Sequence, residues 1–185
     1  MKKLILTFIL GLITVTNVMA AEEVKYTMVN KNKLYEIRKY SDRLVIETET
    51  SHQGSGFRKL FKYISGDNRD KKEIKMTTPV TQVEKDGNMT MQFYMPAEFN
   101  ESNVPDPNNS EVKVLNVKGG YYAAIIYSGR ASDGNFIKYK DILEDQLKRD
   151  RISIISKPIR ATYNSPFTLP VLRRNEVMFK INRNT

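Results

Sequence analysis

The first helix of this chain is expected in the stretch Phe57-Arg58-Lys59-Leu60-Phe61-Lys62-Tyr63-Ile64-Ser65-Gly66. Phe57, Leu60, Phe61 and Ile64 recur at the three- and four-residue spacing that places side chains on one face of a helix. Gly66 stands where glycine commonly ends a helix. The stretch therefore predicts an amphipathic helix over 57–64 that packs one face on a sheet.

Strands are expected on both sides of this helix. Before it, residues 43–50 alternate apolar and polar side chains with a period of two, and Gly54-Ser55-Gly56 is expected as a turn. After it, two strands are expected over 74–83 and 89–95, with a hairpin turn at 85–88. The first half, about residues 35–96, is therefore predicted to be a β-β-α-β-β unit.

The second half, about residues 112–181, repeats that order. Strands are expected over 112–117, 121–128, 160–163 and 176–181, and Asp133-Gly134-Asn135 is expected to cap a helix with the apolar stripe Phe136, Tyr139, Leu143 and Leu147. Residues 97–111, rich in Pro and Asn, are expected to form a linker. Neither half buries its sheet face alone. The pattern predicts one α+β domain: a distorted antiparallel β-barrel of two β-β-α-β-β repeats, with two helices packed outside.

The composition excludes several classes of site. The 185 residues are 40% apolar and 28% charged, which is typical of a globular protein. The absence of Cys excludes a disulfide framework, a thiolate zinc site and a Cys nucleophile. His52 is the one histidine, so a multi-His metal site within one chain is excluded as well. Neither a phosphate-binding G-x-x-x-x-G-K-[ST] motif nor a G-x-S-x-G nucleophile motif occurs.

Residues 1–20 are expected to be a secretory signal peptide. A short basic start, Met1-Lys2-Lys3, precedes an apolar run over 4–15, and small or permissive residues at Val18 and Ala20 predict cleavage before Ala21. An uncleaved membrane anchor is the alternative, although the run is short for a bilayer. The leader contains two of the thirty basic residues and no acidic residue, so the chain from Ala21 has a net charge of +7. The protein is expected to be periplasmic or secreted.

Six strings occur in order along the rest of the chain: Tyr35-Glu36-Ile37-Arg38-Lys39-Tyr40, the stretch 57–66, Ile74-Lys75-Met76-Thr77-Thr78-Pro79-Val80, Phe93-Tyr94-Met95-Pro96, Tyr163-Asn164-Ser165-Pro166 and Arg173-Arg174-Asn175-Glu176-Val177. Together they resemble the SOUL haem-binding protein family. The resemblance implies a distorted barrel of two repeats and the binding of haem or a related porphyrin, in an open hydrophobic groove beside the first helix. The sequence departs from the family at Met178, where Trp is common, and at Lys39, where some relatives have His.

Candidate cofactor-binding residues lie on the first helix. Phe57 and Phe61 offer a flat apolar surface for a macrocycle, and Arg58 and Lys62 offer cations for its propionates. The alternative is an ordinary amphipathic helix whose two Phe rings point into the core. His52, expected in a loop before that helix, is the candidate axial iron ligand, and an exposed loop histidine is the alternative. Arg173 and Arg174, next to Glu176, are interpreted mainly as an ion-pair network that closes the barrel.

The leading functional hypothesis is an exported, non-enzymatic protein that binds a small tetrapyrrole. A small-molecule-modifying enzyme on the same scaffold and an interaction module of the cell envelope are the alternatives. Basic residues are dispersed among acidic ones, which argues against nucleic-acid binding. The net positive charge instead favours weak attraction to anionic membrane surfaces.

Overall fold

The computed structural model describes residues 21–85 and 87–182, so the predicted signal peptide lies outside the described residues. Two helices, α1 (Gln53–Ile64) and α2 (Asp133–Arg149), accompany the strands, and a short 3-10 turn covers Pro170–Leu172. The strands are β1 (Glu22–Glu23), β2 (Thr27–Lys31), β3 (Glu36–Tyr40), β4 (Arg43–Thr50), β5 (Thr77–Thr78), β6 (Val80–Lys85), β7 (Asn88–Tyr94), β8 (Lys113–Val117), β9 (Gly120–Tyr127), β10 (Ile159–Thr162) and β11 (Asn175–Ile181).

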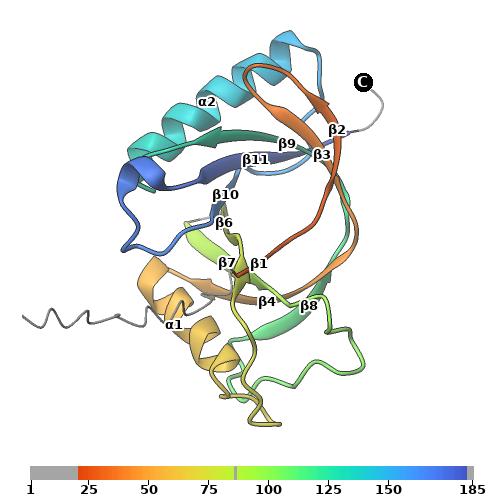
Figure 1. Ribbon diagram of the computed structural model, residues 1–185, viewed down its shortest axis with the longest axis vertical. Helices are drawn as coiled ribbons and strands as arrows, with labels where there is room; N and C mark the ends of the chain where they lie inside the picture. Colours follow the sequence, from red (N-terminus) through yellow and green to blue (C-terminus); the bar gives the residue numbers. More distant parts are fainter. Residues whose placement is uncertain (1–20, 86, 183–185) are drawn as a thin grey trace, which may run out of the picture.

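Nine of these strands form one curled antiparallel sheet in the order β2-β3-β9-β11-β10-β6-β7-β4-β8 (Figure 1). Two pairs of consecutive strands pass through a bend: β3 continues into β4, and β8 continues into β9. β3 pairs with β9 on one side of the bend, and β4 pairs with β8 on the other. Glu36 pairs with Ala124 on one side of the bend, and Arg43 pairs with Val117 on the other, so the register is unbroken across it. Because the β3–β4 and β8–β9 segments stay paired on both sides of the bend, the sheet curls back on itself. This agrees with the predicted α+β barrel.

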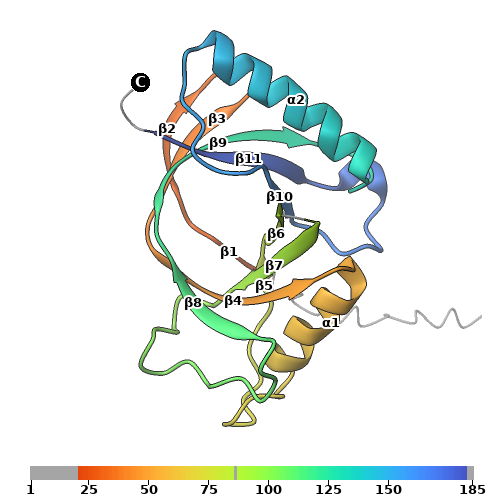
Figure 2. The ribbon, with the colours of Figure 1, turned by 180° about the vertical axis from the view of Figure 1, so that it is seen from behind.

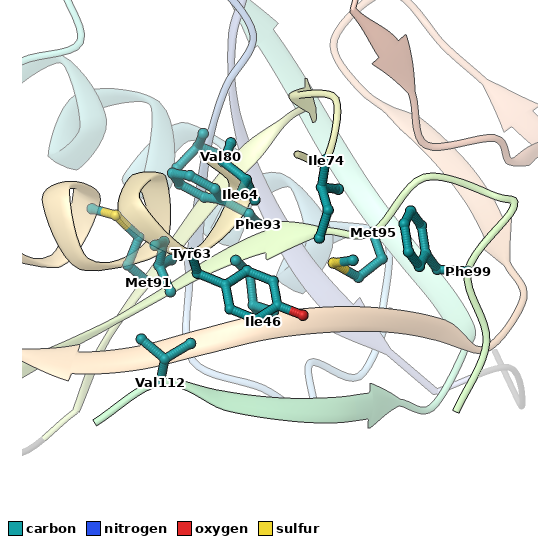
Figure 3. Close-up of a cluster of buried hydrophobic side chains, with 11 residues drawn as sticks. Ile46, Tyr63, Ile64, Ile74, Val80, Met91, Phe93, Met95, Phe99 and Val112 are labelled. Atoms are coloured by element: carbon teal, nitrogen blue, oxygen red, sulfur yellow. The ribbon is translucent and has the colours of Figure 1, made fainter. Parts of the chain in front are cut away.

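Both helices lie outside the curl (Figures 1 and 2). The helix α1 packs on β4 and β7, and α2 packs on β9 and β11. Each covers its own apolar cluster, because every second side chain of a strand faces the helix. The cluster under α1 is shown in Figure 3 and consists of Ile46, Leu60, Tyr63, Ile64, Ile74, Val80, Met91, Phe93, Met95, Phe99 and Val112.

Two local expectations are wrong. The glycines expected as a turn at 54–56 lie inside α1, which begins at Gln53. A Cβ on Gly56 would lie 2.7 Å from the Thr50 side chain, so glycine there lets the helix approach the sheet closely. The cap of α2 is Ser132, whose hydroxyl accepts a hydrogen bond from the Asn135 backbone N–H, rather than the following residues.

The remaining differences concern strands and the linker. The strand expected over 74–83 begins later, with β5 and β6. β2 was not expected, because all five of its residues are exposed and carry no apolar alternation. Residues 97–111 contain no helix or strand of the structure, but Phe99 is buried in the cluster under α1. The linker therefore contributes to the core of the first half.

Candidate functional site

Phe57 and Phe61 form a stacked pair on one flank of α1. Their ring centroids are 5.8 Å apart with 14° between the planes, and the side chains are 41% and 49% exposed. The buried face of the helix contains Gly56, Leu60 and Tyr63 instead, so the predicted apolar stripe is wider than the contact with the sheet. Phe57 also meets Phe93 edge-on at 5.2 Å, which anchors the pair to the core.

The two cations predicted beside this pair are exposed and unpaired. Arg58 and Lys62 make no ion pair or side-chain hydrogen bond with a described residue. Lys59, in contrast, donates to Glu111 at 2.6 Å, so its charge is already neutralised. Arg58 and Lys62 are therefore available to an anionic group that lies against α1.

His52 is exposed and stands at the N-terminal end of α1, as its N-cap residue. Its backbone carbonyl accepts hydrogen bonds from the N–H groups of Ser55 and Gly56, which start the helix. The imidazole makes no hydrogen bond or ion pair with a described residue. The ring thus lies five residues before Phe57, at the end of the helix rather than on the flank that presents the two phenylalanines.

A hollow of about 370 Å³ opens between the two repeats, at the N-terminal ends of both helices. Its lining is mixed: Arg160 donates to Asp133 at 2.7 Å, and its guanidinium lies 4.5 Å from the Phe136 ring centre. The lining residues are Ser51, Gln82, Glu84, Gly87, Asn88, Met89, Asp133, Phe136, Ile137, Lys140, Pro158 and Arg160. Phe57 and Phe61 do not line this hollow, so the phenylalanine pair is a separate, outward-facing surface.

The inner face of the curled sheet contains a buried ion network. The Arg38 guanidinium, which is 0% exposed, donates to Glu176 at 2.7 and 3.0 Å and to Glu36 at 2.6 and 2.8 Å. Arg174 also pairs with Glu176, at 2.7 Å, and Tyr163 donates its hydroxyl proton to the same carboxylate at 2.9 Å. The interpretation of Arg174 and Glu176 as ion-pair partners agrees with this geometry, whereas Arg173 donates to the backbone carbonyls of Thr168 and Pro166 instead.

This network perturbs its own titrating groups. Burial disfavours the charged form of Glu36, but hydrogen bonds from Lys31 and Arg38 outweigh it and hold the pKa of Glu36 below its ordinary value. Burial, and then the charge of Glu176, raises the pKa of Tyr163. Each acid in the network has basic partners: Glu36 pairs with Lys31 and Arg38, and Glu176 pairs with Arg38 and Arg174.

A cluster of tyrosines surrounds Arg43 on the same inner face. The guanidinium carbon lies 4.4, 5.3 and 5.2 Å from the ring centres of Tyr40, Tyr94 and Tyr122. Sequence reasoning missed this cluster and Arg38, although the period-two spacing of residues 36, 38 and 40 places them on one face. Arg43 and these three tyrosines occupy part of the inner face of the curl.

The described residues contain neither a cluster of metal ligands nor a helix that could cross a membrane. No group of three or more His, Cys, Asp or Glu side chains is placed to hold a metal ion within residues 21–85 and 87–182. Within the same residues, no helix has both the length and the apolar character needed to cross a bilayer.

The sequence matches the family model of the SOUL heme-binding protein over residues 21–180. The chain belongs to the SOUL family. That match covers every helix and nearly every strand residue described above, so family membership applies to the whole fold. Among curated proteins, none matches this SOUL chain by sequence.

Solved structures share the fold of this SOUL protein at low identity. The C-terminal domain of EcmrR superposes with a TM-score of 0.60 and 12% identity, covering 85% of this chain and 98% of that one. A hydrolase from Listeria innocua superposes with a TM-score of 0.57 and 10% identity, covering 83% and 94%. At this identity the likeness establishes the architecture alone.

Proposed function

We propose that this SOUL protein is exported, is not an enzyme and binds haem or a related porphyrin. The bound porphyrin lies on the outer flank of α1. The stacked, half-exposed rings of Phe57 and Phe61 are the observation that carries the proposal. A porphyrin needs a flat apolar surface for its macrocycle, and the two rings supply one. Arg58 and Lys62, exposed and unpaired, supply the charge that its two propionates require.

Apolar contact alone gives modest affinity. Removing about 400 Å² of apolar surface from water contributes about 10 kcal/mol, and immobilisation costs about 4 kcal/mol. The remaining 6 kcal/mol or so corresponds to a Kd of tens of micromolar, before any propionate contacts. Nanomolar binding would therefore require a bond to the iron or a deeper pocket.

His52, at the N-terminal end of α1, is the residue that we propose for such a bond, which requires the macrocycle to extend from the Phe57–Phe61 flank to that end of the helix. Its imidazole has no other hydrogen-bond partner among the described residues, and a neutral imidazole is a common haem ligand. When bound, haem would supply an iron centre with an open coordination position. The protein's own residues would bind and orient the ring.

The test is a titration of the chain from Ala21 onward with hemin and with iron-free protoporphyrin. We expect saturable binding of both, and a loss of at least about tenfold in affinity for Phe61→Asp, because a carboxylate would meet both the macrocycle and its propionates. Ile137→Asp is the matched control, since Ile137 is 52% exposed but lines the hollow instead. The proposal is wrong if neither ligand binds, or if Ile137→Asp weakens binding as much as Phe61→Asp.

The role of His52 has a separate readout. His52→Ala should shift the Soret band of the hemin complex and weaken hemin binding, while the affinity for iron-free protoporphyrin should not change. An unchanged Soret band would show that His52 does not ligate the iron and would leave the Phe57–Phe61 surface as the proposed site.

A further inference from the structure

The segment between β10 and β11 presents an apolar tip to solvent. Phe167, Leu169, Val171 and Leu172 are 94%, 65%, 74% and 69% exposed, which makes them the most exposed large apolar side chains of the described residues. Figure 1 shows the segment, in blue, extending from the sheet near the N-terminal end of α2. Four such side chains lie within six residues, and exposed apolar groups gathered in this way mark interaction surfaces.

Hydrogen bonds hold this segment in place. The Arg173 guanidinium donates to the backbone carbonyls of Thr168 and Pro166, and the Gly129 N–H donates to the carbonyl of Pro170 at 2.9 Å. The Arg174 N–H donates to the Asn164 side chain at 2.7 Å. Because hydrogen bonds hold both ends and the middle of this segment, its apolar side chains stay exposed. Folding them back into the core would break those hydrogen bonds.

The segment that contains the tip is basic in sequence. Residues 151–175 contain five basic residues, Arg151, Lys157, Arg160, Arg173 and Arg174, and no acidic residue. Arg160 and Arg174 are paired with acids from other segments, whereas Arg173, which holds the tip, pairs with no acid among the described residues. From Ala21 onward the chain has a net charge of +7. An apolar tip within a basic segment is complementary to an anionic bilayer, whose headgroups attract the cations while its acyl region accepts the apolar side chains.

We infer that this tip, Phe167 to Leu172, inserts into the surface of anionic lipid bilayers and holds the protein there peripherally. The inference is independent of the proposed haem surface, which lies on α1. The net positive charge favours weak attraction of the protein to anionic membranes. The inference assigns that attraction to one segment, Phe167 to Leu172.

The protein contains no tryptophan, which permits a clean measurement. Phe167→Trp, made in the chain from Ala21 onward, places the protein's single tryptophan at the tip, where it can be excited apart from the tyrosines. Vesicles of phosphatidylcholine with phosphatidylglycerol should shift its emission to the blue, and brominated lipids should quench it. Raised salt or pure phosphatidylcholine should reduce both effects, because the attraction is partly electrostatic.

Ile155→Trp is the matched control. Ile155 is 57% exposed, and its N–H bonds to the carbonyl of Lys180, at the end of β11 away from the tip. Its emission should not respond to vesicles. The inference is overturned if Phe167→Trp does not respond to anionic vesicles, or if Ile155→Trp responds equally.

Vesicle sedimentation gives a second, label-free measurement. Phe167→Asp and Leu172→Asp should each weaken vesicle binding by at least about tenfold, because an apolar side chain that enters the bilayer is replaced by a charge, while Ile155→Asp should have no effect. Both Asp variants should bind hemin like the parent chain. If they lose hemin binding but keep vesicle binding, the tip belongs to the porphyrin site and the inference fails. If they instead convert a dimer to a monomer in light scattering, the tip contacts a second copy, and the inference fails as well.

Discussion

At the residue scale, the buried pair of Arg38 and Glu176 is the most consequential charge arrangement in the protein. Both side chains are 0% exposed, so neither charge is solvated by water when its partner is removed. Breaking such a pair leaves an uncompensated charge in the interior.

Glu176→Gln should therefore lower the free energy of unfolding by about 2–4 kcal/mol, since Arg38 retains Glu36 as a partner. Urea unfolding of the purified chain measures this. Glu23→Gln is the matched control, because Glu23 pairs with Arg174 at 41% exposure, and its loss should cost less than about 1 kcal/mol. Equal effects of the two substitutions would contradict the assignment.

Glu36 gives the network a pH dependence. Because its pKa is lower in the folded protein than the ordinary 4.5, its contribution to stability is complete above pH 4.5 and is lost as the pH falls through the folded pKa. Glu36→Gln should make unfolding less dependent on pH in this acidic range. Asp106→Asn, at a carboxylate 71% exposed, should retain the parent slope, and a parent-like slope in Glu36→Gln would contradict the argument.

At the element scale, the joint between β8 and β9 decides whether the sheet can curl. Gly119 crosses directly over the backbone between β3 and β4, where a Cβ would lie 2.6 Å from the carbonyl carbon of Ser41 and closer still to the carbonyl oxygen of Tyr40. Backbone atoms cannot move aside as a side-chain end can, so only glycine fits at this crossing.

Gly119→Ala should lower the free energy of unfolding by about 1–3 kcal/mol. Gly54→Ala is the control: no atom lies within 4 Å of the new Cβ, and alanine favours the helix, so stability should stay equal or rise by about 0.5–1 kcal/mol. Thermal unfolding of both variants separates a steric effect from a general cost of losing glycine.

At the scale of the whole molecule, the residues just after the predicted leader take part in the described fold. Glu22 and Glu23 form β1, and Glu23 pairs with Arg174. We propose that the protein is exported and processed before Ala21, so that these residues follow directly on the new N-terminus.

Expression of the full chain in a bacterium with a general secretory pathway should yield a periplasmic or secreted product whose intact mass corresponds to residues 21–185. Ala20→Phe should block processing, because the position before the cleavage site requires a small side chain. A parent chain that retains residues 1–20 and stays in the cytosol would contradict the export proposal.

Local patterns in the sequence predicted the outline of the fold and supplied the candidate residues on the first helix. The period of two in 43–50 and 89–95, and the helical spacing of Leu143 and Leu147, are local signals, and the structure confirms them. The six family strings likewise identified the SOUL family, which the family match confirms. Aromatic and basic residues on the first helix were also readable, although the sequence left open whether Phe57 and Phe61 face the core.

Which side of each element is buried became known from the three-dimensional packing. The close fit of Gly56 rotates α1 so that Leu60 and Tyr63 contact the sheet, while the two phenylalanines remain outside. Arg38 and Glu176 lie 138 residues apart, so no local pattern reveals their pairing. Burial and long-range pairing depend on how distant segments meet in space, and a periodic pattern in one segment contains no information about its neighbours.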